Sequence, residues 1–189
     1  MTGIGTRLRK PGKIRAALAT VSVCAALLGA PTAPAFANGW SVAKTAYFAP
    51  TDTYYQLVKT KTNWQDSAAL AGKLKHQGRA GRLAVVDNRD LHEWLISSFR
   101  FNQRPYTSII WIGLRYWCPA RMLAWVDNEP VARGAFAPWH PQWHRSSVVC
   151  GRARIDFMGV YYEGEKTNLW QAAGQAKLGD HALVEFPPE

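Results

Sequence analysis

The sequence predicts an α+β domain with an antiparallel sheet, because two segments of helical periodicity precede a series of short strands. A doubly wound parallel sheet would instead need helices and strands to alternate along the chain. The early strand predicted at residues 54–59 needs a partner, and the last apolar segment, residues 181–186, is the natural one. We therefore expect the two ends of the domain to pair side by side.

Two helices are predicted from apolar stripes that repeat at helical intervals. The first should run over residues 63–75, where Thr62 and Gln65 have the spacing of a capping box. Asp87 or Asn88 should cap the second helix. The first stripe consists of Trp64, Ala68, Ala71 and Leu74, and the second of Leu91, Trp94, Leu95 and Phe99.

The strands are predicted from short runs rich in β-branched and aromatic residues. Residues 109–114 form an apolar run that is too short to span a membrane, so they indicate a buried strand. A second strand should follow over residues 122–126, and residues 83–86 should form a short strand between the helices. Residues 127–130 predict a turn, because Asp and Asn tolerate left-handed backbone and Pro130 cannot continue a paired strand.

These strands also carry a family resemblance. The motif Trp111-Ile112-Gly113-Leu114, followed by Trp-Val-Asp-Asn-x-Pro at residues 125–130, resembles the core of a C-type lectin-like domain. Residues 61–68 are similar to the family's first-helix opening, and residues 81–86 to the strand between its helices. The resemblance covers residues 54–186 and implies two helices, an antiparallel sheet, paired terminal strands and a long loop between Asn128 and Val148.

The first 37 residues have the organisation of a secretory signal peptide. Five basic residues and no acid come first, and an apolar run over residues 16–30 and a small-x-small cleavage signal at residues 35–37 follow. The apolar run is shorter than the roughly 20 residues of a spanning helix, so we expect cleavage before Asn38 and no stable membrane insertion. A secreted or periplasmic protein is the expected product.

The mature chain, residues 38–189, is expected to form a single domain, because it contains no linker and no repeat. Removing the signal peptide leaves 23 − 5 = 18 Lys and Arg against 13 acids, so the net charge falls from +10 to +5. The remaining cations are scattered rather than clustered on one helix, so nucleic acid is not an expected partner. An acidic glycan or an anionic surface would suit the residual charge.

The mature chain contains two cysteines, Cys118 and Cys150, and export would permit a disulfide. In the family that the chain resembles, one bridge ties the first helix to the closing strand, and a second lies in the long-loop region. Ala71 and Val184 stand at the positions of the first bridge, so apolar packing is expected to replace it here.

Cys150 matches one half of the second bridge, but its partner position near Gln175 is not a cysteine. We expect Cys118 to take that role, since the strand ending at Leu114 should run antiparallel to one beginning near Val148. Two free buried thiols are the alternative.

The resemblance also locates a ligand site, at the long-loop end. Sugar-binding members of the family hold calcium through a Glu-Pro-Asn or Gln-Pro-Asp triplet and an Asn-Asp pair after a Trp in the next strand. Here the sequence has His-Pro-Gln at 140–142 after Trp139, and Gln-Ala at 171–172 after Trp170. Calcium needs several oxygen ligands, so we expect no metal at this place. Only Gln142, Asn168 and Gln171 offer neutral oxygens.

Signals for catalysis are weak. His140 and His144 have the spacing of a metal pair, but Pro138 and Pro141 place them on a loop without a carboxylate. The sequence has no Gly-x-Ser-x-Gly elbow, no phosphate-binding loop and no nucleophile-base pair that spacing alone would single out. We therefore expect no cofactor and no enzymatic activity.

Aromatic residues gather in segments that are expected to be loops, and the segments contain Tyr116, Trp117, Phe136, Trp139 and Trp143. We expect Trp139 to anchor a loop, and Trp117 and Trp143 to be exposed beside Arg115, His144 and Arg145. The candidate ligand-binding residues are Trp117, His140, Gln142, Trp143, Arg145, Asn168 and Gln171.

The resemblance thus implies a secreted or periplasmic recognition module that binds carbohydrate independently of calcium. The alternative is a lectin-like domain that binds protein, such as an adhesin or a host-directed factor. An exposed aromatic shelf beside amide and Arg donors would favour sugar, and a broad flat apolar patch would favour protein.

Overall fold

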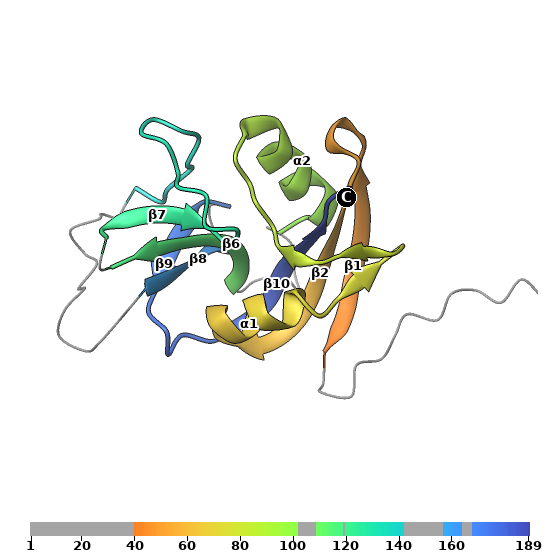
Figure 1. The fold of residues 1–189 in the computed structure, drawn as a ribbon, viewed down its shortest axis with the longest axis horizontal. Helices are drawn as coiled ribbons and strands as arrows, with labels where there is room; N and C mark the ends of the chain where they lie inside the picture. The colour runs from red at the N-terminus through yellow and green to blue at the C-terminus, as the bar shows by residue number, and fades with distance from the viewer. Residues whose placement is uncertain (1–39, 102–108, 119, 142–156, 164–167) are drawn as a thin grey trace, which may run out of the picture. The chain divides into compact units, whose positions relative to one another are not determined.

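The computed structural model describes residues 40–101, 109–118, 120–141, 157–163 and 168–189, which all lie within one compact unit. Two helices and an eight-stranded mixed sheet confirm the predicted α+β class (Figure 1). The helices are α1 (Trp64–Ala71) and α2 (Arg89–Phe99), with a 3-10 turn η1 (Ala49–Thr51). The strands are β1 (Ser41–Phe48), β2 (Thr53–Thr62), β3 (Lys75–His76), β4 (Arg79–Ala80), β5 (Arg82–Leu83), β6 (Ile109–Trp117), β7 (Met122–Trp125), β8 (Phe157–Glu163), β9 (Trp170–Ala173) and β10 (Gly179–Phe186).

The early and closing strands pair as the sequence predicts. Strand β10 runs antiparallel to β2, with Phe186 opposite Tyr54 and Ala182 opposite Val58. An additional strand, β1, pairs with the other side of β2 and was not expected from the sequence. The main sheet has the order β1-β2-β10-β6-β8-β9, while β5 pairs with β10 and β7 with β6.

One contact departs from the predicted antiparallel sheet. Strands β6 and β10 are parallel, with Ile110 opposite His181 and Trp111 opposite Ala182. This contact joins two antiparallel groups, β1-β2-β10 on one side and β7-β6-β8-β9 on the other. Both strands supply buried side chains at these positions, so the short parallel contact lies inside the core.

The two helices begin with asparagine caps. Helix α1 begins after Asn63, whose side chain accepts a hydrogen bond from the backbone N–H of Asp66 at 2.9 Å. The predicted cap Thr62 is wrong, because Thr62 belongs to β2 and its hydroxyl contacts Ser67 instead. Helix α1 also ends at Ala71, four residues before the predicted end at residue 75. Helix α2 begins after Asn88, one of the two predicted caps.

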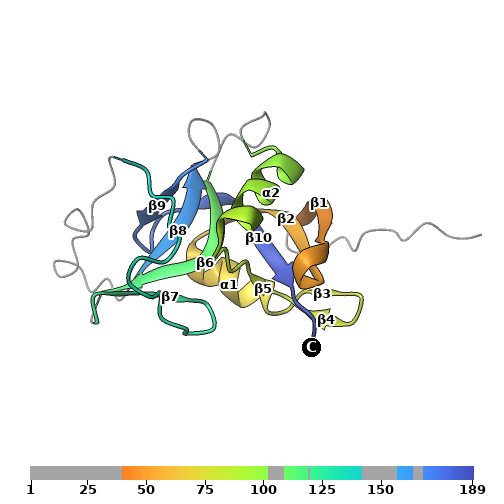
Figure 2. The same cartoon turned by 90° about the horizontal axis from the view of Figure 1, so that it is seen from above.

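The helices pack on opposite faces of the β2-β10 pair, as Figure 2 shows from above. Leu95 of α2 lies in the same cluster as Leu57 of β2 and Leu183 of β10. Ala71 of α1 lies in the other cluster with Val184 of β10. Ala71 and Val184 are fully buried, which agrees with the expected apolar packing in place of a disulfide.

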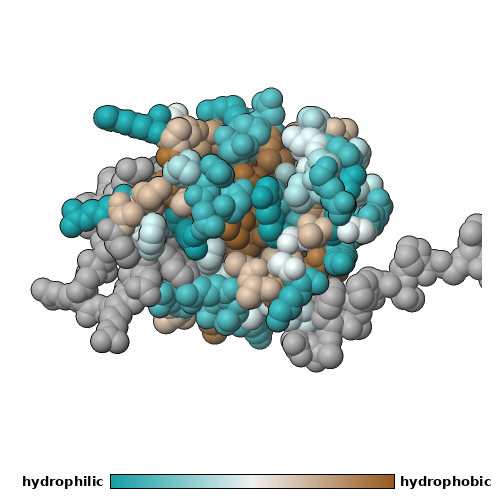
Figure 3. Space-filling model, in the orientation of Figure 1, coloured by the Kyte–Doolittle hydropathy of each residue, from teal (hydrophilic) through white to brown (hydrophobic). Residues whose placement is uncertain are grey.

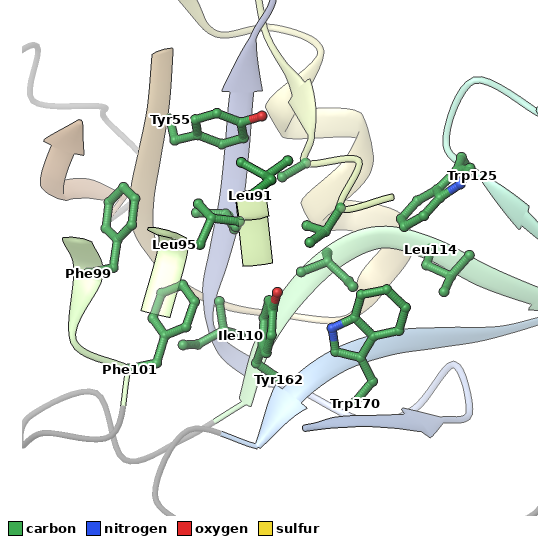
Figure 4. Close-up of a cluster of buried hydrophobic side chains, with 14 of the residues drawn as sticks. Tyr55, Leu91, Leu95, Phe99, Phe101, Ile110, Leu114, Trp125, Tyr162 and Trp170 are labelled. Atoms are coloured by element: carbon green, nitrogen blue, oxygen red, sulfur yellow. The ribbon is translucent and has the colours of Figure 1, made fainter. Parts of the chain in front are cut away.

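The larger cluster continues from α2 to strands β6, β8 and β9 through aromatic rings that pack in tilted and edge-on contacts (Figure 4). Phe101, Tyr162 and Trp170 are completely buried, with ring centroids 5.1 Å and 6.3 Å apart along this series. The hydroxyl of Tyr162 lies 2.9 Å from Nδ1 of His92 on α2, so a buried hydrogen bond accompanies the ring packing. Neither helix of the described residues is long and apolar enough to cross a membrane.

The cysteine prediction falls partly outside the described residues. Cys118 follows β6 directly and is buried in the larger cluster. Cys150 and Val148 lie outside the described residues, so the expected strand near Val148 stays a prediction; strand β8 (Phe157–Glu163), which follows them, runs antiparallel to β6. The Cys118–Cys150 disulfide stays a prediction, which a mass change of two hydrogens on reduction of the purified protein would confirm.

The glycine of the Trp-Ile-Gly-Leu motif lies where β6 meets the chain before α2. The N–H of Gly113 donates to the carbonyl of Ala84 at 2.8 Å. A Cβ at Gly113 would lie 2.6 Å from the carbonyl oxygen of Leu83 and 2.9 Å from that of Ala84. Both of these atoms are backbone, so they cannot turn aside as a flexible side chain would.

We predict that Gly113→Ala lowers the free energy of unfolding by about 1–3 kcal/mol, because the new methyl group overpacks this contact. Gly72→Ala is the matched control, since Gly72 has φ −64° and its Cβ would come no closer than 3.7 Å to a neighbour. Urea denaturation of both variants measures the effect. Equal stability of the two variants would contradict the steric explanation.

A partly buried ion pair joins β5 to β10. Glu185 is 3% exposed, and it accepts hydrogen bonds from Nε of Arg82 at 2.6 Å and from the N–H of Val85 at 3.1 Å. Burial raises the pKa of Glu185 to about 7, although the charge and hydrogen bond of Arg82 act in the opposite direction. Desolvation of the carboxylate therefore raises the pKa of Glu185 by more than the interactions with Arg82 lower it.

We predict a pH-dependent stability difference between the wild type and Glu185→Gln. The folded-state pKa of about 7 lies above the ordinary value of 4.5, so protonation of Glu185 stabilises the folded state. This stabilisation is complete below about pH 4.5 and is lost as the pH rises through about 7. The wild type should therefore lose stability relative to the variant as urea denaturations move from about pH 5 to pH 8.

The stability difference between the wild type and the variant excludes the contributions of other titrating groups. Burial lowers the pKa values of His76, His92 and His181, so these side chains destabilise the folded state as the pH falls. They are present in both proteins and cancel in the difference. Parallel pH profiles for the two proteins would show that Glu185 does not titrate in this range.

Candidate functional site

The β6–β7 hairpin has a buried face and an accessible face. Leu114 lies opposite Trp125, and Tyr116 lies opposite Leu123. All four of these side chains are buried in the larger cluster. Because successive side chains of a strand point to opposite faces, the alternate residues Arg115, Trp117, Met122 and Ala124 lie on the other face of the hairpin.

The accessible face of the hairpin contains a cavity of about 330 Å³, lined by Arg115, Trp117, Met122, Ala124 and Asn128. Trp117 is 46% exposed, and among the large hydrophobic residues that the structure describes only Tyr47 and Leu178 are exposed as well. The expected exposure of Trp117 is confirmed, but Trp117 and Tyr116 belong to β6 and not to a loop. We call this set of five lining residues the hairpin cavity.

Arg115 is held in the hairpin cavity from two sides. One Nη atom donates to Oδ1 of Asn128, and the guanidinium carbon lies 5.9 Å from the ring centroid of Trp64. Trp64 is itself fixed, because its indole N–H donates to the carbonyl of Ile112 at 2.7 Å and its side chain packs over Gly159. The guanidinium therefore has a defined position rather than free rotation in solvent.

The turn after β7 positions the amide of Asn128. Asn128 has φ +72°, its N–H donates to the carbonyl of Trp125 at 2.9 Å, and the N–H of Trp125 donates to the carbonyl of Glu129 at 2.8 Å. Asp127 pairs with Arg82 at 2.9 Å. The Asn-Glu-Pro sequence at 128–130 thus forms a structural turn, as the sequence suggests, and its asparagine faces Arg115.

A second group of the predicted residues lies around Trp170. The N–H of Trp170 donates to the carbonyl of Pro138 at 2.7 Å, and the N–H of His140 donates to the carbonyl of Trp170 at 2.9 Å. The ring of Trp139 packs edge-on against Trp170 at 5.7 Å between centroids. Trp139 is thus the predicted anchor of its loop, and the backbone of His140 lies beside that of Gln171.

Asn168 lies two residues before Trp170 and has φ +50°. Its Oδ1 is buried and has no hydrogen-bond partner among the described residues. Asn168, His140 and Gln171 therefore belong to one region of the surface, with half-buried side chains.

The structure separates Trp117 from this second group. Gln171 lies opposite Tyr161 of β8, and Tyr161 lies opposite Trp111 of β6. Trp111 and Trp117 are six residues apart, which corresponds to roughly 20 Å along a strand. Gln142, Trp143 and Arg145 lie outside the described residues, so their positions relative to either group stay predictions.

A further cavity, of about 450 Å³, lies between β7 and residues 131–139. Its lining includes Arg121, Arg133 and Trp139, together with small residues of the 131–137 segment. The indole of Trp139 already packs against Trp170, so this cavity offers cations but no free aromatic surface comparable to Trp117.

The sequence predicts Arg115 beside an exposed Trp117, but it does not single out Arg115, Met122, Ala124 or Asn128 as ligand-binding residues. The available signal was the alternation within β6, where Arg115 and Trp117 are two residues apart and so share a face. Adding β7 and the turn required the register of the hairpin. Neither register nor turn geometry follows from the composition of the two strands.

No protein-family model matches the chain, and no curated protein matches it. Several solved structures are similar. The C-type lectin CEL-I from Cucumaria echinata has a TM-score of 0.53 at 14% identity, over 73% of this chain and 92% of that chain. The Ca²⁺-independent C-type lectin SPL-2 from Saxidomus purpuratus has a TM-score of 0.55 at 14% identity, over 76% and 91% of the two chains.

The cow C-type carbohydrate-recognition domain of CD23, solved in the presence of a GlcNAc2Man3 oligosaccharide, has a TM-score of 0.54 at 16% identity. That match covers 84% of this chain and 99% of the cow domain. At these low sequence identities, the structural similarity establishes the fold but not the ligand. Together with the paired terminal strands, the two helices and the Trp-Ile-Gly-Leu strand, these structural similarities show that this chain has the fold of C-type lectin-like domains.

Proposed function

We propose that the protein is an exported recognition module that binds carbohydrate without calcium, and that the hairpin cavity is its binding site. The observation that carries the proposal is the exposed indole of Trp117 beside Arg115 and the amide of Asn128. An aromatic face can stack on a sugar ring, while guanidinium and amide groups donate hydrogen bonds to its oxygens. This arrangement is the one that distinguishes a sugar site from a flat protein-binding patch.

The character of the surface supports sugar over protein as the ligand. On the face that Figure 3 draws, the strongest apolar colour lies near the centre, smaller apolar spots lie elsewhere, and polar side chains separate them. The exposed large hydrophobic residues are also dispersed, since Tyr47 belongs to β1, Trp117 to β6 and Leu178 to the segment before β10. A protein-binding surface would favour a broad contiguous patch.

Calcium does not suit the residues at the place where the resemblance puts a calcium site. His140 offers an imidazole nitrogen, and Asn168 and Gln171 offer neutral amide oxygens. Within the described residues, no group of three or more His, Cys, Asp and Glu side chains could hold a metal ion. Calcium affinity depends on several oxygen ligands and their negative charge, so this set is a poor fit. The similar lectin SPL-2 is itself described as Ca²⁺-independent.

We propose export because of the amino-terminal sequence. The basic start, the apolar run over residues 16–30 and the Ala-x-Ala signal at 35–37 together predict cleavage before Asn38. A secreted or periplasmic location would bring the domain to extracellular or cell-wall glycans. Amino-terminal sequencing of the protein from the culture medium or periplasm would establish the cleavage site.

We predict that the purified protein binds at least one glycan on an array, equally well in calcium and in a chelator. Trp117→Ala should weaken binding at least about fivefold, because a central aromatic contact is worth more than about 1 kcal/mol. The measurement is calorimetry with the glycan that the array identifies. A requirement for calcium would contradict the calcium-independent part of the proposal.

Tyr47→Ala is the matched control for Trp117→Ala. Tyr47 is also an aromatic residue with 46% exposure, but it lies on β1, which is separated from β6 by β2 and β10. Its substitution should leave glycan binding unchanged. An array without any bound glycan would overturn the carbohydrate proposal and favour the rival, a lectin-like domain that binds protein.

A further inference from the structure

We propose that the hairpin cavity selects acidic carbohydrate, with the carboxylate of a uronic-acid-type sugar on Arg115 and the sugar ring on Trp117. This inference rests on the proposed function and names the ligand class of the same site. It follows from three features of the cavity: a cation with no acidic partner among the described residues, the hydrogen-bonding groups that its contacts leave open, and an aromatic surface at a matching distance.

The first feature is the charge of Arg115. Three other arginines have acidic partners: Arg79 pairs with Asp52, Arg82 with Glu185 and Asp127, and Arg89 with Glu93. Arg100, Arg121 and Arg133 have none among the described residues, but their side chains are exposed. Within the described residues Arg115 forms no such ion pair, although it is half-buried. Its nearest partners are the neutral amide of Asn128 and the ring of Trp64. A partly desolvated guanidinium without a counter-ion favours an anionic ligand.

The second feature is the set of donors that remain after these contacts. The Nε of Arg115 is buried and has no hydrogen-bond partner among the described residues. Asn128 uses its Oδ1 to accept from Arg115, so its Nδ2 is the amide group left for a ligand, and Nδ2 is a donor. A carboxylate only accepts hydrogen bonds, so it complements the Nδ2 group of Asn128, while the buried Nε contributes only to the charge of the guanidinium.

The third feature is the distance between cation and ring. Arg115 and Trp117 are two residues apart on one face of β6, so their Cα atoms are separated by about 7 Å. A sugar ring stacked on Trp117 can therefore direct an exocyclic carboxylate toward Arg115. Met122 and Ala124 on the neighbouring strand supply apolar surface beside the ring and no competing charge.

Calorimetry with matched probes tests the proposal. The probes are oligosaccharides of galacturonic, glucuronic and mannuronic acid, each beside its carboxyl-reduced neutral counterpart. At least one acid should bind about tenfold or more tightly than its neutral counterpart, because charge-assisted hydrogen bonds are about twice as strong as neutral ones. The preference should shrink as salt is added.

Three variants locate the preference. Arg115→Gln should abolish the difference between acid and neutral probes, and Asn128→Asp should do the same by neutralising Arg115 while keeping a residue that tolerates positive φ. Arg133→Gln is the matched control, since it removes the same charge from the cavity beside residues 131–139. Thermal unfolding establishes that each variant is folded. Arg115→Gln and Asn128→Asp cancel the charge of Arg115 in different ways, so the test still stands if one of them does not fold.

The outcomes separate this inference from the proposed function. Equal affinity for acid and neutral probes would overturn the acidic selectivity and leave carbohydrate binding in place. An equal loss of acid binding in Arg133→Gln and Arg115→Gln would assign the preference to net charge rather than to the hairpin cavity. If the acidic probes, their neutral counterparts and the glycan array all fail to bind, the proposed function itself fails. Tighter binding of sulfated or phosphorylated sugars than of uronic acids would overturn the carboxylate assignment.

Discussion

The close contact between β6 and the chain before α2 is the constraint on which the rest of the fold depends. Gly113 lies against the backbone of Leu83 and Ala84, with no room for a side chain, and the indole of Trp64 donates to Ile112 beside it. These contacts fix β6 from two sides at the centre of the sheet. Once β6 is fixed, strand alternation directs Leu114 and Tyr116 into the core and leaves Arg115 and Trp117 outside.

Much of the fold was predictable because its signals are local and periodic. The helix stripes, the Trp-Ile-Gly-Leu strand and the apolar closing strand each follow from residues that are near in sequence. Strand β1 escaped prediction because it is an edge strand in which only Phe48 is buried, so its apolar alternation is weak. The parallel contact of β6 with β10 also escaped, since it involves only two residue pairs and depends on the final packing of distant segments.

The candidate site was less predictable, because it depends on register rather than on residue type. The family resemblance placed Trp117, His140 and Gln171 at one end of the molecule, but the strand pairings set Trp117 and Gln171 well apart. The aromatic character of Trp117 was visible in the sequence. Its neighbours across the hairpin were not, because a shift of one residue would have turned Met122 and Ala124 to the other face.

Two adjacent residues of one turn, Asp127 and Asn128, contact different arginines: Arg82 receives an acidic partner and Arg115 a neutral one. Asp127 is bound to Arg82, which also binds Glu185, so its carboxylate serves the ion-pair network at β5. Asn128 follows with positive φ, which directs its side chain to Arg115 instead. Because Asp127 pairs with Arg82, it does not neutralise Arg115. The network that holds the turn in place thus also preserves the positive charge of the hairpin cavity, on which the proposed preference for acidic carbohydrate rests.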